Sequence, residues 1–399
     1  MPLRRLKPGY FTLEGLNSFA TVYYFYYFYF FMQQAFGFGN KANLALAALN
    51  GVIYMVFAWL GGKFAQRFGY FTALKLGFVV MLGALAVGTQ LTSAPGQILV
   101  MSVTVVGMCF TWPTLEALVS EGETVTGLPR MVGIYNMVWA GTAAVAYFTG
   151  GAMLENLGLK SLFYVPIAIQ LCQLALTLWL ESKARQATER HAVAQASGPP
   201  PGPPALEPNL RPVAKAKLFL SMAWLANPFA YVAINTLIAA VPGVAKRLEL
   251  STTLAGFCCS IWCFSRLAAF VVLWRWTGWH YRFRWLLVSY LALVGTFSAI
   301  LMAPNIAVLV LAQVLFGAVA GLIYYSSLFY SMDVGETKGE HGGIHEAAIG
   351  LGNFAGPAVG AASLYFLPKY ANSGTLAVSG LLLLGLGGLL AIWRSGNGS

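Results

Sequence analysis

Long apolar runs alternate with short polar turns along almost the whole chain of 399 residues. A helix needs about 20 mainly apolar residues to cross the hydrocarbon core of a bilayer. The turns between the runs, such as 93–96 and 303–305, are rich in Gly, Pro, Asn and Ser. We therefore predict an all-α integral membrane protein whose twelve transmembrane helices cover residues 13–34, 42–62, 71–91, 97–119, 131–154, 159–180, 218–241, 252–275, 285–303, 306–331, 343–367 and 375–393.

One long polar interruption, residues 181–217, divides this pattern into two sets of six helices. It carries several charges and then the run Ser-Gly-Pro-Pro-Pro-Gly-Pro-Pro at 197–204. Such a segment buries too little apolar surface to fold, and its prolines favour an extended linker. We predict a six-helix bundle over 1–180, a Pro-rich linker over 181–217, and a second bundle over 218–399 that ends in a short disordered tail.

The two bundles resemble each other at one constant spacing of 210 residues. Matches at this spacing include Asn17 with Asn227, Leu99 with Leu309, and Gly150 with Gly360. Because each set has an even number of spans, both copies share one orientation in the membrane. The sequence thus predicts two parallel repeats related by an axis along the membrane normal.

Composition and charge support this assignment. The chain is 58% hydrophobic and only 9% charged, with a mean hydropathy of +0.69, far from the averages of soluble proteins. Its net charge of +11 comes from Lys and Arg between the apolar runs, with no nucleic-acid-binding module around them. Eighteen of these residues lie on the side of the termini and five on the other, which predicts cytoplasmic termini. The first run is too long for a cleavable signal peptide and is expected to remain as a helix.

Six plus six helices, cytoplasmic termini and a long middle loop resemble the major facilitator superfamily over essentially the whole chain. Between helices two and three this family usually carries Gly-x-x-x-Asp-Arg-x-Gly-Arg/Lys. Here Gly62, Arg67 and Gly69 match, whereas Gln66 replaces the acid and Tyr70 the last base. The resemblance implies that these residues act in the conformational change, and the altered acid removes the usual charge contact with helix eleven.

The eleventh predicted helix carries a second motif, with Gly352, Gly356, Pro357 and Gly360 in Gly-x-x-x-Gly-Pro-x-x-Gly. This is similar to a glycine-rich motif that antiporters of the family usually place on helix five. Small residues four apart allow close approach of helices in lipid. We interpret the motif as a packing surface.

Four ionisable residues within the predicted spans are singled out: Glu116, Arg266, His345 and Glu346. Charges within a membrane are costly, so such residues are candidates for function. Glu116 is the first candidate for a proton carrier. The alternative interpretation is that its side chain extends to the cytoplasmic surface and carries no proton. Glu346 and His345 are further candidates, although Glu346 also suits a helix N-terminus. Arg266 is expected to bind an anionic substrate or to form a structural ion pair.

Polar residues also recur along the first and seventh predicted helices. Amides and phenols are costly facing lipid, so we interpret both stripes as walls of a central cavity, with helix packing as the alternative. Weaker candidates for the cavity lie on helices four, five and ten. The predicted substrate-binding residues are Asn17, Thr21, Tyr24, Asn136, Asn227, Tyr231, Asn235, Arg266 and Tyr324.

These features predict a secondary active transporter of a small organic solute, working by alternating access, coupled to protons as a symporter. An efflux antiporter for amphipathic compounds stays open, as do a membrane enzyme acting on lipid-linked substrates and a transporter-like sensor. With four histidines and no nucleotide-binding motif, we expect no enzyme activity, no cofactor and no metal site. We expect a monomer in the inner cell membrane whose partners are the bilayer, its solute and protons, and no nucleic acid.

Overall fold

The computed structural model describes residues 6–123, 127–196, 213–334 and 340–397, and this part of the chain is built of helices joined by short turns. In chain order they are α1 (Lys7–Phe36), α2 (Asn40–Phe68), α3 (Tyr70–Gly88), α4 (Ala94–Cys109), α5 (Trp112–Ser120), α6 (Leu128–Leu157), α7 (Ser161–Ala196), α8 (Val213–Arg247), α9 (Thr252–Cys259), α10 (Ile261–Arg275), α11 (Phe283–Leu301), α12 (Ile306–Val334), α13 (Glu340–Phe366) and α14 (Ser373–Asn397).

Each of the twelve predicted spans coincides with one helix or with two consecutive helices, so the prediction is confirmed. The fourth span is divided into α4 and α5 just before Pro113, which has no N–H to donate and whose ring clashes with the carbonyl of Cys109. The eighth span is divided into α9 and α10 at Ser260, whose hydroxyl donates to the carbonyl of Phe257 at 3.1 Å. Such local side-chain bonds compete with the helical ladder.

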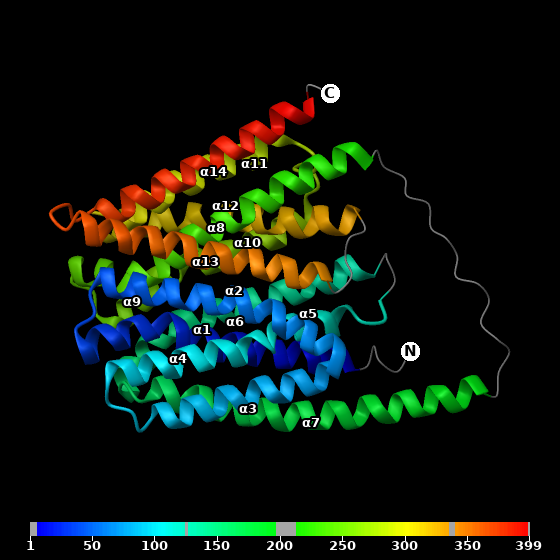
Figure 1. Ribbon diagram of the computed structural model, residues 1–399. Helices are drawn as coiled ribbons and strands as arrows, with labels where there is room; N and C mark the ends of the chain where they lie inside the picture. Colours follow the sequence, from blue (N-terminus) through cyan, green and yellow to red (C-terminus); the bar gives the residue numbers. More distant parts are fainter. Residues whose placement is uncertain (1–5, 124–126, 197–212, 335–339, 398–399) are drawn as a thin grey trace.

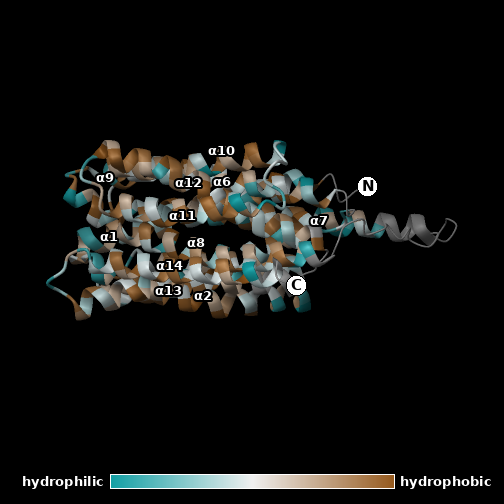
Figure 2. Cartoon of the chain, turned by 90° about the horizontal axis from the view of Figure 1, so that it is seen from above, coloured by the Kyte–Doolittle hydropathy of each residue, from teal (hydrophilic) through white to brown (hydrophobic). Residues whose placement is uncertain are grey.

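Eleven of the described spans are long and apolar enough to cross a membrane. The first helix, α1, has 30 residues but many tyrosines and amides, which lower its mean hydropathy. These polar rings do not face lipid, because Tyr23, Tyr24 and Tyr27 are buried inside the protein. Figure 2 shows hydrophobic residues along the middle of the helices and hydrophilic ones gathered at their ends, as expected for a protein that spans a bilayer.

The two halves lie side by side, with α3 and α7 on one outer flank and α11 and α14 on the other (Figure 1). The start of α1, the end of α7, the start of α8 and the end of α14 lie at one end of the molecule, here named the terminal face. The other end, where α1 meets α2 and α8 meets α9, is named the opposite face. Both halves therefore begin and end at the same face, as parallel repeats require.

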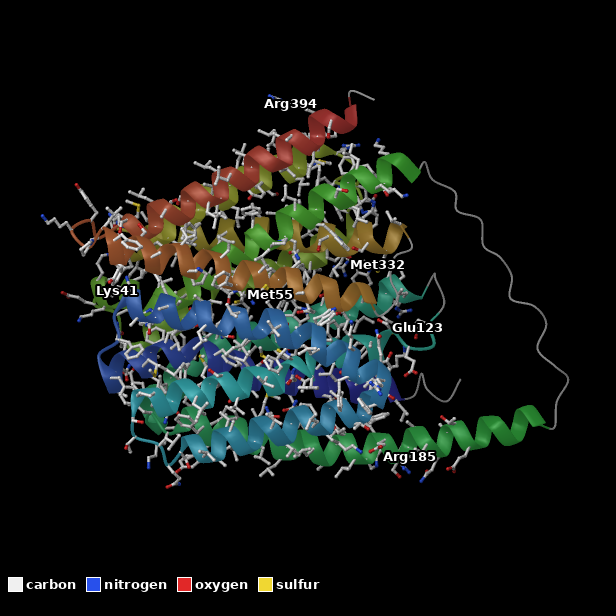
Figure 3. The ribbon with its side chains drawn as sticks, viewed as in Figure 1. Lys41, Met55, Glu123, Arg185, Met332 and Arg394 are labelled. Atoms are coloured by element: carbon white, nitrogen blue, oxygen red, sulfur yellow. The ribbon has the colours of Figure 1, made fainter. Side chains whose placement is uncertain are left out.

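Helices α2 and α13 pack closely and antiparallel across the boundary between the halves. A Cβ atom added to Gly51 would overlap the backbone of Phe354, and one added to Gly350 would overlap the backbone of Met55. Figure 3 places Met55 midway along α2, where the two helices meet, and Lys41 at the opposite face. Small residues thus bring the two backbones into contact.

The first part of the predicted linker, from residue 181, is helical. Helix α7 continues to Ala196, and Glu181 pairs there with Lys75 and with Arg185, each at 2.7 Å. A pair four residues apart supports a helix, so the charges of this segment extend α7 instead of ending it. The proline-rich run 197–204 lies outside the described residues, and α8 begins at Val213. The division into domains stays a prediction.

Candidate functional site

A central cavity of about 120 Å³ lies between the two halves. On the same measure a single water occupies roughly 10–15 Å³, so the space suits a small solute. Helices α1, α2, α4, α5 and α6 of the first half and α8, α10, α12 and α13 of the second half line it. Its polar lining residues are Glu14, Thr21, Tyr26, Asn50, Tyr54, Trp112, Glu116, Tyr135, Trp139, Tyr231, Asn235, Arg266, Tyr324, Glu346 and Asn353.

Three carboxylates from three helices face this cavity. Glu14 on α1 is buried, and its Oε1 accepts a hydrogen bond from the hydroxyl of Ser18 at 2.7 Å. Glu116 on α5 is half-buried, and Glu346 near the start of α13 is buried. The hydroxyl of Tyr54 on α2 donates to Oε2 of Glu346. This last bond joins the two halves, so the state of Glu346 and the separation of the halves are linked.

The cationic group of the cavity is Arg266 on α10. Its guanidinium lies over the rings of Trp139 on α6 and Trp262 on α10, 4.4 and 4.7 Å from their centroids. The residue is only 3% exposed, and its Nε and Nη2 have no hydrogen-bond partner. Among the described residues, no carboxylate forms an ion pair with it. The aromatic faces stabilise the positive charge and leave the donors at Nε and Nη2 free.

An aromatic layer separates the central cavity from a second pocket nearer the terminal face. The ring of Tyr324 lies 5.7 Å from that of Trp139 and 5.7 Å from that of Phe270, and Trp139 lies 6.3 Å from Phe270. Beyond these rings the second pocket has a volume of about 130 Å³ and is lined by α6, α10 and α12, with Asn136 and Tyr325 among its residues. The two spaces therefore follow one another along the boundary between the halves.

Toward the opposite face the halves close the cavity by direct contact. A Cβ atom at Gly151 on α6 would overlap the carbonyl of Thr252 at the start of α9. Glu155 on α6 accepts a hydrogen bond from the backbone N–H of Thr253 at 2.8 Å, and Gln34 on α1 donates to the hydroxyl of Thr252 at 3.0 Å. The cavity thus lies between direct helix contacts toward the opposite face and the aromatic layer toward the terminal face.

The structure brings seven of the residues proposed from the sequence to the central cavity. They are Thr21, Glu116, Tyr231, Asn235, Arg266, Tyr324 and Glu346. Asn235 lies there as one member of a hydrogen-bonded pair with Asn353 on α13. Asn136 lines the second pocket and accepts a hydrogen bond from the indole of Trp139 at 2.9 Å. The side chain of His345 lies outside the described residues.

Three other proposed residues lie away from both spaces, which differs from the expectation. Asn17 is buried against α5, where its side-chain oxygen accepts from Thr111 at 3.3 Å, and Tyr24 packs its ring 6.2 Å from that of Phe163 on α7. Asn227 is buried one helical turn from Tyr231. On α1 the cavity face runs through Glu14, Thr21 and Phe25, and Asn17 and Tyr24 lie on its flank.

Sequence reasoning did not single out Glu14, although it is the second residue of the first predicted span, 13–34. The helix begins at Lys7, so Glu14 lies two turns inside it. Pro8 within the first turn is the signal that marks this earlier start. The ammonium of Lys7 also pairs with Glu123 at 2.7 Å and donates to the carbonyl of Val119 at 2.6 Å, which ties the start of α1 to the end of α5.

The two proposed conformational motifs lie at different helix contacts. Gly62, Gln66, Arg67 and Gly69 lie at the end of α2, where Gln66 is exposed and Gly69 has a φ of 93°. On α13, Gly352 and Gly356 pack against the backbone of α8, Pro357 lies inside the helix, and Gly360 faces Leu44 of α2.

Comparisons with known proteins agree with this architecture. The model of the major facilitator superfamily matches residues 16–357. The structure of the nucleoside transporter NupG is similar at 14% identity and a TM-score of 0.68, covering 98% of this chain and 99% of that one. A peptide transporter POT is similar at 14% identity and a TM-score of 0.69, covering 98% and 95%.

A third similar structure is described as revealing substrate recognition in proton dependent oligopeptide transporters. It shares 17% identity at a TM-score of 0.66 and covers 97% of this chain and 99% of that one. No curated protein matches the chain. The family model covers most of the sequence, and the fold agrees with it. The chain therefore belongs to the major facilitator superfamily, a family of multi-pass membrane transporters of small solutes and not of enzymes.

Proposed function

We propose that the protein is a symporter that moves a small polar organic solute together with protons by alternating access. The observation that carries the proposal is the convergence of Glu14, Glu116 and Glu346 from both halves on one central cavity. Among the described residues none of these carboxylates forms an ion pair, and an unpaired carboxylate away from water is costly as an anion. In a cavity that opens to water on one side of the membrane and then on the other, such carboxylates can bind a proton on one side and release it on the other.

Glu116 and Glu346 are the proposed carriers. Glu346 is hydrogen-bonded to Tyr54 in the other half, so a movement of the halves changes its surroundings directly. Glu116 faces the same cavity from α5, at the end of the span nearer the terminal face. A proton bound at either residue therefore becomes accessible from the same side of the membrane, at the same time, as the solute.

The polar lining favours a hydrogen-bonding solute over an amphipathic compound. Asn50, Asn235 and Asn353 contribute amides, and Tyr231 and Tyr324 contribute phenols. Groups of this kind in an enclosed pocket fix the orientation of a polar ligand. One similar structure concerns proton dependent oligopeptide transporters, which is consistent with the same driving ion here.

We further propose that the protein is a monomer in the cell membrane, with the terminal face in the cytoplasm, since most Lys and Arg residues lie on that side. Labelling a cysteine placed at Ser395 from inside, and not from outside, intact cells tests the orientation. Efficient labelling from outside would reverse it.

Proteoliposomes that enclose a pH-sensitive dye test the coupling. Solutes from several classes, including nucleosides, dipeptides, amino acids, sugars and organic acids, are added outside, and we expect at least one to acidify the lumen. Glu346→Gln and Glu116→Gln remove a proton site but keep the shape, so loss of acidification with retained exchange of the labelled solute identifies a carrier. Glu189→Gln, on the exposed end of α7, is the matched control.

Two outcomes contradict the proposal. Proton symport through these residues is ruled out if no solute acidifies the lumen. It is also ruled out if both glutamine variants acidify the lumen as much as the control does. Alkalinisation of the lumen on adding an amphipathic cation instead supports the efflux antiporter.

A further inference from the structure

The guanidinium of Arg266 is held rigidly in the central cavity. Its two aromatic neighbours come from different halves, Trp139 from α6 and Trp262 from α10, and Trp139 is itself fixed by its hydrogen bond to Asn136. Arginine stacks well on aromatic faces because its charge is delocalised over a plane. The stacking orients this plane without using its N–H groups.

The free donors of Arg266 lie along one edge of the group. Nε–H and the syn hydrogen of Nη2 point in parallel, and both nitrogens are buried without a hydrogen-bond partner. A buried donor without a partner is unfavourable, and a buried charge more so. This edge matches the two coplanar oxygens of a carboxylate, which arginine binds through two parallel hydrogen bonds.

The three glutamates of the cavity do not supply this carboxylate. Among the described residues, Arg266 forms no ion pair, although Glu14, Glu116 and Glu346 line the same space. A phosphate dianion entering beside three acidic side chains meets more repulsion than a singly charged carboxylate. The local charges therefore favour an anion of low charge.

We infer that Arg266 binds the carboxylate of the transported solute through its Nε and Nη2 edge, so that the substrate is a small monocarboxylate. The inference rests on the proposed transport function and names its substrate class. Nε and Nη2 of Arg266 gain hydrogen-bond acceptors only when the solute is present. An empty cavity thus retains an unmatched donor pair that selects for a planar anionic group.

Matched pairs of ligands test the inference on the purified full-length protein. Acetate, benzoate, glycine and glycylglycine are compared with acetamide, benzamide, glycinamide and glycylglycinamide by their effect on the thermal unfolding midpoint, at constant pH and ionic strength. Ligands that bind the folded state raise this midpoint. We expect at least one carboxylate to raise it and its amide to have no effect.

Substitutions then locate the binding group. Arg266→Lys keeps the charge but loses the two parallel donors, and we expect the affinity for the effective carboxylate to fall about tenfold or more. Arg266→Gln is expected to abolish binding. Arg275→Gln, at the exposed end of the same helix, is the matched control and is expected to bind as the unaltered protein does.

The inference is overturned if no carboxylate of the panel binds, if amides bind as well as their carboxylates, or if Arg266→Gln retains binding. The comparison of ligands on the unaltered protein decides the matter even if Arg266→Gln fails to fold. Equilibrium binding needs no gradient, so this result is independent of proton coupling. Proton-driven transport of a neutral solute without carboxylate binding would uphold the proposed function and reject this inference alone.

Discussion

Where α6 faces α9, α10 and α12, the halves meet through backbone atoms near the opposite face but through aromatic rings nearer the terminal face. At the first place Gly151 lies against the carbonyl of Thr252, with no side chain between the helices. At the second, Trp139, Phe270 and Tyr324 fill the space between the central cavity and the second pocket. Backbone contacts separate only when whole helices move, whereas rings can also turn about their side-chain bonds. The two barriers are therefore expected to open by different motions.

The largest effect is expected from Gly151→Val, which places branched side-chain atoms where the carbonyl of Thr252 lies. Overpacking of this kind costs about 1–3 kcal/mol, or about 5- to 150-fold in the population of the closed arrangement. The measurement is the rate at which an impermeant thiol reagent, added at the opposite face, modifies a cysteine placed at Ile238 in the cavity. The native cysteines are replaced by alanine in this experiment.

Gly83→Val provides the control for this prediction, because nothing lies within 4 Å of a Cβ at that position. Equal reagent rates in the two variants would mean that the contact at Gly151 does not close the opposite face.

A smaller effect is expected from Phe270→Ala, which removes one ring of the aromatic layer. Aromatic pairs are worth about 0.5–1.5 kcal/mol each, so we expect about a fivefold faster reaction of the same cysteine from the terminal face. The rate from the opposite face should stay unchanged. Phe366→Ala, at an exposed ring, serves as the control. An increase from both faces alike would show a general loosening of the protein instead of an opened barrier.

The smallest effect is expected from Glu155→Ala. Glu155 accepts from the N–H of Thr253 across the halves, whereas Ser251 accepts from the N–H of Leu254 at 3.1 Å within the second half. Both side chains bond the start of α9, but only the first bond crosses the boundary. We expect Glu155→Ala to raise the rate of modification from the opposite face about twofold. This corresponds to about 0.5 kcal/mol, the low end of the cost of a lost helix cap. Ser251→Ala should leave this rate unchanged. Equal rates in the two variants would mean that both hydrogen bonds only cap α9.

The spans could be predicted from the sequence because burial in lipid requires long apolar runs, and these are visible without any tertiary contact. The general location of the site was also accessible. Glu116, Arg266 and Glu346 were singled out because ionisable side chains inside a membrane span are costly and mark functional sites. All three line the cavity.

The rotation of each helix was not accessible from the sequence. Thr21 faces the cavity and Tyr24 does not, although three residues along a helix lie on neighbouring faces, because the packing of α1 against α7 decides which flank turns inward. Glu14 was not singled out because it stands at the edge of the first apolar run, whereas the helix itself begins earlier, at Lys7. The pairing of Asn235 with Asn353 depends on tertiary contact between α8 and α13, which local patterns do not contain.

The contact between α2 and α13 extends over most of the span. From the opposite face inward, Gly360 meets Leu44, the backbone of Phe354 meets Gly51, and Glu346 meets Tyr54. The other edge of the boundary, between α6 and α10, contains the second pocket instead. The α2–α13 contact is therefore expected to act as a hinge that holds the halves together along one edge. We expect solute to enter and leave at the other edge, beside α6, α10 and α12.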